Sequence, residues 1–316
     1  MCLILVAWQV HPSYPLVVAA NRDEYFARPT EAAGFWKNSP QVLAGRDGEA
    51  GGTWMGITRG GRFAALTNFR DPAQNRSGAP SRGALVADFL TGSRRPQEYL
   101  DGVAARGSAY NGYNLLAGDG ETLWWSSNMG SGPRQLAPGV YGVSNHLLDT
   151  PWPKVGAGKT ALAQALDQLP DDRALFTLLR DDGIHPDQHL PQTGIPLDWE
   201  RLLSSAFVRS PDYGTRGSTV LCMGKDGWIS FDEQTWLPGA KPGCRMRYRF
   251  KDASPVISSA TSPPGTPREG GEGGGGPGLP AHDKTKLRGF RDLRVAVGAT
   301  SVSLSAPWSG AECRLP

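Results

Sequence analysis

The second residue of the chain combines two groups that could do nucleophilic chemistry. Cys2 is small enough to permit removal of the initiator Met1, which would leave its α-amine free. A free α-amine has a pKa of about 7.7–8.0 and can act as a base near neutral pH, while the thiolate is the nucleophilic form of cysteine. One residue would then supply both nucleophile and base. The alternative interpretation is that Cys2 is simply a small buried side chain.

A second candidate is a run of polar residues, Asn21 to Glu24, which directly follows the apolar stretch Leu16–Ala20. Polar residues at the end of a strand are placed to line a cleft. In that setting Arg22 could anchor a carboxylate or steady a thiolate, and Asp23 could orient an α-amine. On composition alone, a solvated turn with a local ion pair is the competing interpretation.

The elements that must position these residues are mostly strands. Cys2–Trp8 and Leu16–Ala20 are continuous apolar runs, which are typical of strands buried on both faces. Asp-Gly pairs at 119–120 and 226–227 lie between apolar runs and predict tight turns, hence antiparallel pairing. Apolar residues at helical spacing, as in Leu85–Leu90, predict helices between the strands. We expect a sheet-on-sheet core covered by helices.

Composition excludes several classes of protein. The formal net charge of +3 is too balanced to indicate a nucleic-acid partner, and no apolar run approaches the roughly 18–20 residues needed to span a bilayer. The cysteines (Cys2, Cys222, Cys244 and Cys313) are scattered without a CxxC motif, which fits neither a disulfide framework nor a zinc site and favours a reducing compartment. We therefore expect a cytoplasmic protein without a metal site.

The character of the chain changes near Ala253. Residues 262–278 are mostly Pro, Gly, Glu, Ser and Thr, and such a segment cannot bury enough apolar surface to order itself. We predict one domain over residues 1–250 and a disordered Gly/Pro-rich extension over residues 251–316, to which no function is assigned.

Motifs spread over the first 250 residues resemble those of the NRDE family, also called the transport and Golgi organisation protein 2 family. The motifs are Met1-Cys2 with its apolar strand, Ala19–Glu24, Gly51–Gly56, Ala64–Asn68, Tyr110–Leu115, Tyr141–Asn145, Thr150–Lys154 and Tyr213–Arg216. The resemblance implies an α+β fold, a four-layer αββα sandwich of two mainly antiparallel sheets covered by helices, like that of N-terminal-nucleophile hydrolases. It also implies that Cys2, Arg22 and Asp23 share one pocket.

A more distant resemblance, to the bile-salt hydrolase and penicillin V acylase group, extends the candidate catalytic set. By position, Asn145 could donate to an oxyanion and Arg216 could stabilise a charged base or a substrate carboxylate. The catalytic candidates are thus Cys2, Arg22, Asp23, Asn145 and Arg216. The candidates for binding a ligand are Asn21, Arg22, Asp23, Glu24, Trp54, Asn68 and His146, of which His146 could also ligate haem iron.

Three hypotheses about function remain open at this point. The family implies a protein that binds and handles an amphipathic small molecule, in haem mobilisation or in acyl-CoA or lipid handling. The alternative is a cysteine amidohydrolase that acts on C–N amide bonds with Cys2 as nucleophile. The third is a scaffold that keeps the fold and has lost the chemistry. Neither the ligand nor the oligomeric state can be derived from the sequence.

Overall fold

The computed structural model describes residues 2–252 and 309–312. These residues belong to one compact unit, and a second unit, residues 255–306, lies outside the described residues. The predicted Gly/Pro-rich extension therefore falls outside the described residues, apart from residues 251–252 and 309–312. The fold below is that of the first unit.

The first sheet holds the beginning of the chain near one edge. Its strand order is β10-β1-β2-β11-β12-β13-β14, and all neighbours are antiparallel. Both faces of β1 and β2 are covered, by the second sheet on one side and by helices on the other. The strands are β1 Cys2–Trp8, β2 Leu16–Tyr25, β10 Gly139–Val143, β11 Tyr213–Met223, β12 Trp228–Leu237, β13 Lys241–Lys251 and β14 Ser309–Glu312.

The second sheet is an antiparallel meander in which each strand pairs with the next along the chain. Short turns such as the one at the Asp-Gly pair 119–120, between β7 and β8, make this topology possible. The strands are β3 Thr30–Trp36, β4 Ser39–Asp47, β5 Met55–Thr58, β6 Phe63–Asn68, β7 Tyr113–Gly118, β8 Leu123–Ser127 and β9 Arg134–Gln135.

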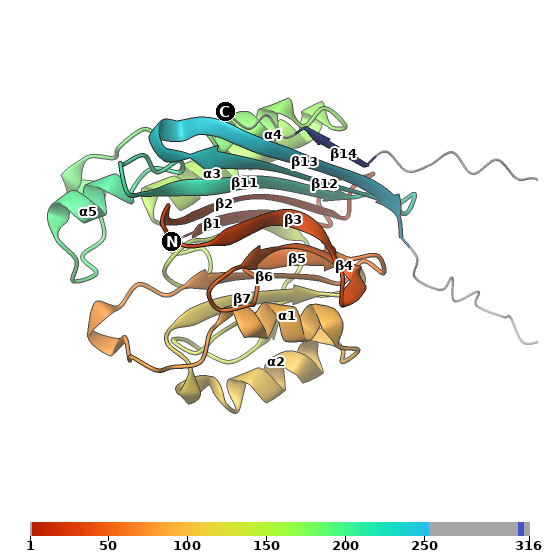
Figure 1. Cartoon of the computed structure of the whole chain (residues 1–316), viewed down its shortest axis with the longest axis horizontal. Helices are drawn as coiled ribbons and strands as arrows, with labels where there is room; N and C mark the ends of the chain where they lie inside the picture. The colour runs from red at the N-terminus through yellow and green to blue at the C-terminus, as the bar shows by residue number, and fades with distance from the viewer. Residues whose placement is uncertain (1, 253–308, 313–316) are drawn as a thin grey trace, which may run out of the picture. The chain divides into compact units, whose positions relative to one another are not determined.

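Helices cover the outer faces of both sheets (Figure 1). Helices α1 (Gly83–Thr91) and α2 (Pro96–Ala104) pack on the second sheet, and α3 (Pro153–Ala165) and α4 (Arg173–Leu178) pack on the first. Helix α5 (Leu197–Leu202) follows before β11. In the part of the chain that the structure describes, no helix has the length and apolar character needed to cross a membrane. Single 3-10 turns lie at Pro72–Gln74, Gly107–Ala109, Leu166–Gln168, Asp187–His189 and Pro238–Ala240.

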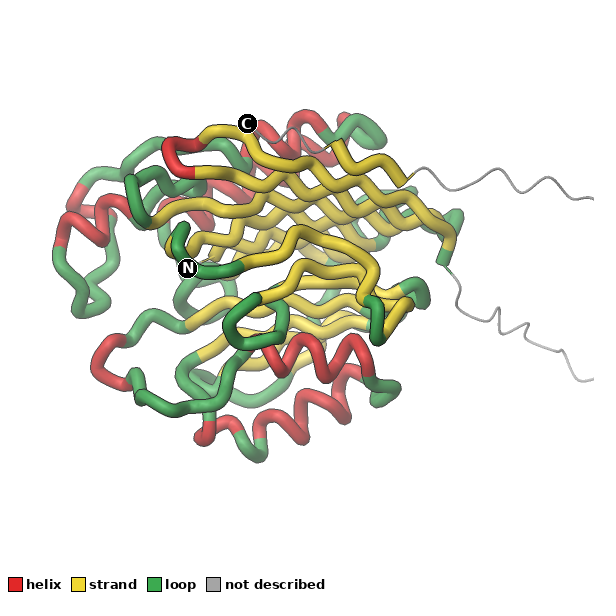
Figure 2. The backbone as a smooth tube through the Cα atoms, viewed as in Figure 1, coloured by secondary structure: helices red, strands yellow, loops and turns green. Residues whose placement is uncertain are grey.

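The pleat of β1 explains why its sequence is apolar without interruption. Ile4, Val6 and Trp8 pack between the two sheets, while Leu3 and Leu5 pack against the helices. The layers are therefore helices, sheet, sheet and helices (Figure 2). The predicted α+β class and the four-layer αββα arrangement of two antiparallel sheets are confirmed.

Candidate active site

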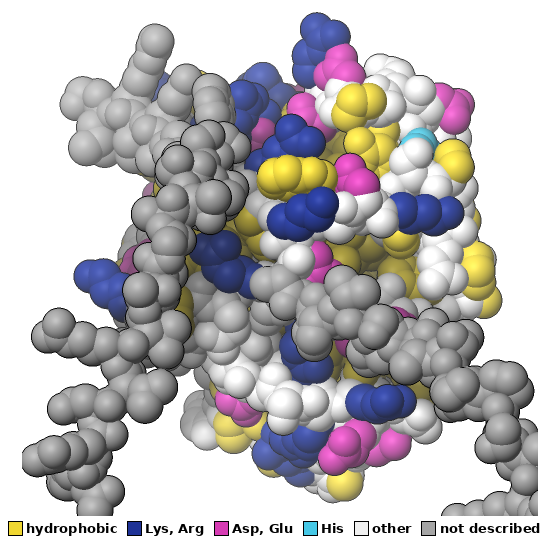
Figure 3. Space-filling model, turned by 90° about the vertical axis from the view of Figure 1, so that its right-hand side faces the viewer, with side chains coloured by type: hydrophobic (Ala, Val, Ile, Leu, Met, Phe, Trp, Pro, Cys, Tyr) yellow, Lys and Arg dark blue, Asp and Glu magenta, His cyan; other side chains and the backbone are white. Residues whose placement is uncertain are grey.

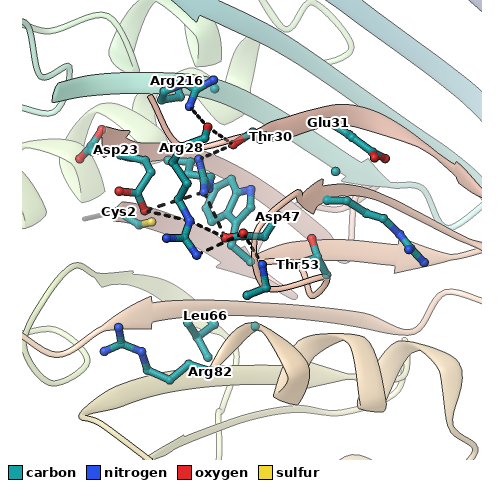
Figure 4. Close-up of a pocket in the computed structure, with 18 of the residues that line it drawn as sticks. Cys2, Asp23, Arg28, Thr30, Glu31, Asp47, Thr53, Leu66, Arg82 and Arg216 are labelled. Carbon is teal, nitrogen blue, oxygen red and sulfur yellow. Dashed lines mark hydrogen bonds and ion pairs between the residues drawn. The ribbon is translucent and has the colours of Figure 1, made fainter. Parts of the chain in front are cut away.

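A cavity of about 620 Å³ opens beside the start of β1. Its walls come from β1, β2, β3, β4, β11 and β12 and from the segment that leads into α1 (Figure 4). The lining includes the thiol of Cys2 and a mixture of arginines and carboxylates. On the face shown in Figure 3, positive and negative side chains are likewise interspersed over the described surface.

Cys2 lies directly opposite Arg22 in the pairing of β1 with β2. Residues opposite each other in an antiparallel pair point to the same side of the sheet, so both side chains face the cavity. Burial raises the pKa of the Cys2 thiol, and the charge of Asp23 raises it further, against the opposing effect of Arg22. The thiol therefore needs a base to form a thiolate at neutral pH.

The other described cysteines differ chemically from Cys2. Cys222 is a free thiol on the helix-facing side of β11, and burial raises its pKa to about 12. Cys244 is disulfide-bonded and so has no free thiol. Within the described part of the chain, Cys2 alone combines a free thiol with a place in the cavity.

The pleat of β2 separates the polar run that the sequence presents as one group. Arg22 and Glu24 continue the alternation of Val18 and Ala20, which face the space between the sheets, whereas Asn21 lies on the side of Val17 and Ala19, which face the helices. From the sequence, the strand was expected to end at Ala20, with the polar run following it, but β2 continues through the run to Tyr25.

Asn21 is consequently buried outside the cavity, contrary to the expectation that it binds a ligand. Its Nδ2 donates to the carbonyl oxygens of Leu179 at 2.7 Å and Ala206 at 2.8 Å, and its Oδ1 accepts from Ser218 Oγ at 2.6 Å. Through these hydrogen bonds, the Asn21 amide connects β2 of the first sheet to the segments that pack on its helix-facing side.

Asp23 is a lining residue of the cavity, but its carboxylate is bound on the helix-facing side of β2. Thr215 Oγ1 donates to Asp23 Oδ1 at 2.7 Å, and the Tyr213 hydroxyl donates to the Asp23 carbonyl at 3.2 Å. Burial raises the pKa of Asp23, and the positive charge of Lys154 is the largest influence that lowers it. The carboxylate is thus held rigidly beside the start of β1.

Ion pairs tie together the charged groups on the cavity side. Arg22 Nη2 lies 3.7 Å from Asp47 Oδ2 and 3.8 Å from Glu24 Oε2. Arg28 donates from Nε and Nη2 to the two carboxylate oxygens of Asp47, at 2.8 and 3.1 Å. Although burial alone would raise the pKa of Asp47, the hydrogen bonds from Arg28 bring it below its usual value.

Within the described residues, two half-buried arginines of the cavity donate hydrogen bonds only to carbonyl oxygens. Arg216 Nη1 donates to the carbonyls of Tyr25 at 3.0 Å and Arg28 at 2.6 Å, and Arg82 Nη1 donates to the carbonyl of Gly112 at 3.0 Å. Neither forms an ion pair with a carboxylate of the described residues. Arg82 extends into the cavity from the side of the second sheet, and Arg216 extends from the first sheet (Figure 4). An anion in the cavity could therefore pair with an arginine on either wall.

Two of the remaining predicted residues, Trp54 and Asn68, line the cavity, but Asn145 does not. Asn145 Nδ2 donates to the Asn68 carbonyl at 2.8 Å, and the neighbouring Ser144 Oγ donates to the Cys2 carbonyl at 2.9 Å. Asn145 therefore supports the wall of the cavity and does not form it.

His146 also lies outside the cavity, contrary to the sequence-based expectation. Its Nδ1 is 2.8 Å from Thr150 Oγ1, and its ring packs between Phe69 and Trp152, at centroid distances of 4.8 and 5.9 Å. Burial lowers the pKa of the imidazole, which favours a neutral ring.

Sequence reasoning missed a buried charged cluster behind Asp23. Arg70 and Glu200 form an ion pair at 2.6 Å. Lys154, in the first turn of α3, is only 3% exposed, and its Nζ has no hydrogen-bond partner within the described residues. Burial lowers the pKa of Lys154 to about 8. The signal in the sequence was a lysine placed directly after Trp-Pro at the start of a helical pattern.

Layers and cavity together define a class: a four-layer αββα protein in which a free thiol at the start of the first strand faces a cavity lined by arginines and carboxylates. The chain belongs to the Transport and Golgi organisation 2 family, whose model matches residues 1–238. The predicted membership of the NRDE family is thereby confirmed.

Relatives agree with this assignment over most of their length. The chain is 41% identical over 266 residues to a Transport and Golgi organization protein 2 homolog of Bos taurus, covering 77% of this chain and 95% of that protein. It is 37% identical to the Homo sapiens homolog, covering 75% and 94%, and 30% identical to Transport and Golgi organization protein 2 of Drosophila melanogaster, covering 77% and 94%.

Among solved structures, the chain is similar to a Caenorhabditis elegans N-acylethanolamine-hydrolyzing acid amidase ortholog, with 14% identity and a TM-score of 0.39, covering 70% of this chain and 92% of that one. It is also similar to the C2A mutant of a conjugated bile acid hydrolase from Clostridium perfringens, with 10% identity and a TM-score of 0.40, covering 79% and 92%.

Proposed function

We propose that the cavity binds a small amphipathic molecule with anionic groups, of the kind represented by haem or an acyl-CoA thioester. The observation that carries the proposal is the pair Arg82 and Arg216, which lie on two walls of a cavity of about 620 Å³ and form no ion pair with a carboxylate of the described residues. That volume lies within the roughly 300–1,000 Å³ typical of small-molecule sites.

The arginines retain most of their binding capacity. A guanidinium has five N–H donors in a planar fork. Among the described residues, Arg82 donates from one nitrogen to one carbonyl oxygen, and Arg216 donates from one nitrogen to two carbonyl oxygens. The free donors suit the bidentate binding of a carboxylate or phosphate group. Arg22 and Arg28, in contrast, are already paired with Asp47.

An apolar part of the ligand would meet Trp54, Leu66 and Trp236, which also line the cavity. They suit an acyl chain or the edge of a porphyrin. If haem is the cargo, its propionates would pair with the arginines, and Cys2 would be the residue able to ligate iron, because His146 lies outside the cavity.

The proposal is tested by titrating the purified full chain with haemin, followed by its Soret band, and with palmitoyl-CoA, followed by calorimetry. We expect micromolar affinity for at least one of them, and a loss of about tenfold, or about 1.4 kcal/mol, in each of Arg82→Met and Arg216→Met. Arg209→Gln, which changes an exposed arginine outside the cavity lining, is the matched control. If neither compound binds at micromolar concentration, the proposal fails.

A second candidate function, a cysteine amidohydrolase, is favoured by the backbone N–H of Asp23, which donates to the Cys2 thiol at the wall of the cavity. After removal of Met1, the α-amine of Cys2 would take the thiol proton while sulfur attacks the amide carbonyl. The same proton would pass to the leaving amine, and water would then hydrolyse the thioester. Asn68 is the better-placed donor to the oxyanion, since Asn145 is bound to the Asn68 carbonyl.

The two candidates are separated by intact mass spectrometry and by hydrolysis assays on N-acyl amides. The hydrolase requires a mature chain that begins at Cys2, and it requires that Cys2→Ala abolish turnover while Cys222→Ala retains it. Turnover that survives in Cys2→Ala contradicts this mechanism. A chain that keeps Met1, binds no ligand and hydrolyses nothing would instead support the scaffold hypothesis.

A further inference from the structure

Glu233 is a buried carboxylate in the cavity wall, and one of its two oxygens has only a weak partner. It lies on β12 and is 6% exposed. The backbone N–H of Ala33, on β3, donates to Glu233 Oε1 at 2.7 Å. Within the described residues, Oε2 accepts from Thr219 Oγ1 at 3.4 Å, which is long beside the roughly 2.7–2.8 Å usual for a hydroxyl donor. Oε2 can therefore accept a further hydrogen bond.

Open space adjoins this oxygen because residue 217 is a glycine. A Cβ placed on Gly217 would lie 3.9 Å from Glu233 Oε2 and would meet no other atom within 4 Å outside its chain neighbours. Gly217 is not among the glycines with a positive φ, so its backbone conformation does not require a glycine. Both residues line the cavity. The missing side chain thus leaves room for a ligand atom to approach Oε2 closely.

The strand register places this oxygen near the other groups of the site. Gly217 lies opposite Arg22, and Arg22 lies opposite Cys2, so the three form one row on the cavity face of β1, β2 and β11. At the usual strand spacing of about 4.8 Å, Gly217 is roughly 10 Å from Cys2. Arg216 directly precedes Gly217, as the extra residue of a β-bulge. An anion held by Arg216 would therefore bring its neighbouring atoms close to Glu233.

The surroundings of Glu233 favour an ionised carboxylate. Ala33 and Thr219 both donate hydrogen bonds to it. Burial raises the pKa of Glu233, while the hydrogen bond from Ala33 and the positive charge of Arg22 oppose this effect. An ionised carboxylate accepts hydrogen bonds and donates none. The ligand group that fits Oε2 is consequently a donor.

We propose that Glu233 determines specificity in the cavity, by accepting at Oε2 a hydrogen bond from an amide N–H next to the anionic group of the ligand. The inference rests on the proposed function, because it takes an amphipathic anion as the occupant. It narrows that class to acyl amides with an anionic end, such as N-acylated amino acids. An ester of the same shape would place an acceptor oxygen against the carboxylate and is selected against.

The test compares two probes that differ in one group, N-lauroylglycine and its ester analogue O-lauroylglycolate, by calorimetry on the full chain at pH 7.5. The unchanged chain should bind the amide about tenfold more tightly, because the ester oxygen cannot donate to Glu233. Glu233→Gln keeps an oxygen for the Ala33 N–H and presents an NH₂ group to the cavity. The preference for the amide should then disappear or reverse.

Two further variants isolate the contact. Glu31→Gln removes an exposed carboxylate of the same cavity lining, so it should shift both affinities alike and leave their ratio unchanged. Gly217→Ala covers Oε2 without touching the bond from Ala33, and it should reduce the preference to less than about threefold. It tests the same contact if urea denaturation shows that Glu233→Gln is unstable.

Several results would overturn the proposal. One is equal binding of the two probes by the unchanged chain, and another is a preference that persists in both Glu233→Gln and Gly217→Ala. A preference lost in Gly217→Ala but kept in Glu233→Gln would show that position 233 acts as a donor, which contradicts its role as an acceptor.

Titration with haemin and palmitoyl-CoA keeps this inference separate from the proposed function. If N-lauroylglycine does not bind but haemin or palmitoyl-CoA does, the role of Glu233 fails and the binding function stands. If none of these compounds binds at micromolar concentration, the proposed function itself fails, and the role of Glu233 fails with it. Tight binding of the amide that depends on Glu233 supports both.

Discussion

Strand β2 carries four consecutive polar residues, Asn21 to Glu24, near its end, and its pleat places them in two different surroundings. On the cavity side, Arg22 makes ion pairs with Glu24 and Asp47 at 3.8 and 3.7 Å. On the helix side, Asn21 and Asp23 make hydrogen bonds of 2.6–2.8 Å with fixed partners. The long ion pairs can exchange partners with a ligand, whereas the short buried bonds hold elements together. Adjacent residues of one motif thus serve separable purposes.

The largest effect should come from the helix side. Asn21→Ala would leave the carbonyls of Leu179 and Ala206 and the hydroxyl of Ser218 without their partner. Each buried polar group left unsatisfied costs about 1–3 kcal/mol, so we expect a loss of about 3 kcal/mol or more in the free energy of unfolding. Urea denaturation measures this loss.

The exposed Asn38 provides the matched control, because Asn38→Ala should change the free energy of unfolding by less than about 0.5 kcal/mol. If Asn21→Ala is as stable as the unchanged chain and loses ligand affinity instead, the two faces of β2 have been assigned the wrong way round.

The next effect concerns pH and tests the buried charge on the helix side. Burial lowers the pKa of Lys154 from 10.5 to about 8. Between these values the unfolded chain binds more protons than the folded one, so the contribution of Lys154 to stability rises with pH. The difference in unfolding free energy between the unchanged chain and Lys154→Met should increase by about 1.5 kcal/mol from pH 8 to 9.5.

Denaturation curves at both pH values, taken in parallel for the two proteins, cancel the contributions of other titrating groups. A difference that stays constant with pH would mean that Lys154 keeps a normal pKa. Lys154 would then give no support to the contrast between a buried, rigid helix side and a cavity side whose ion pairs can exchange partners with a ligand.

The cavity side should respond in ligand affinity and not in stability. Arg22→Met leaves Glu24 and Asp47 facing the cavity with less positive charge, so we expect the affinity for haemin or palmitoyl-CoA to fall by about tenfold. The free energy of unfolding should change by less than about 1 kcal/mol, because the ion pairs of Arg22 are long and Asp47 keeps its two hydrogen bonds from Arg28.

Glu24→Gln is the matched variant for this residue, since it removes the opposing charge and should strengthen binding of the same anionic compound. Calorimetry on the pair gives two shifts of opposite sign. Shifts of the same sign would show that the loss comes from general damage to the cavity wall and not from charge.

Much of this arrangement could be predicted from the sequence. The apolar run Cys2–Trp8 predicts a strand covered on both faces, and the Asp-Gly turns predict antiparallel pairing, as the structure has them. Several predicted residues line one cavity: Cys2, Arg22, Asp23, Glu24, Trp54, Asn68 and Arg216. These residues lie on strands or segments whose own motifs could be identified in the sequence.

What the sequence could not predict depends on contacts between distant segments. Arg82 and Asp47 reach the cavity from separate elements, and neither lies in a motif. Whether Asn21 faces the cavity depends on β2 continuing to Tyr25, since the alternation of side chains persists only within a strand. The burial of Lys154 depends on α3 packing against the first sheet.

The smallest effect is expected at His146, next to Asn145 in the chain but outside the cavity. Its ring packs between Phe69 and Trp152, so His146→Ala should leave the affinity for haemin within about twofold of the unchanged chain. The Soret maximum of the complex should not move, because the imidazole does not reach a ligand in the cavity. A shifted maximum in this variant, with Cys2→Ala unaffected, would place iron ligation on the far side of the wall formed by Asn68. The cavity face of β2 would then no longer be the binding face.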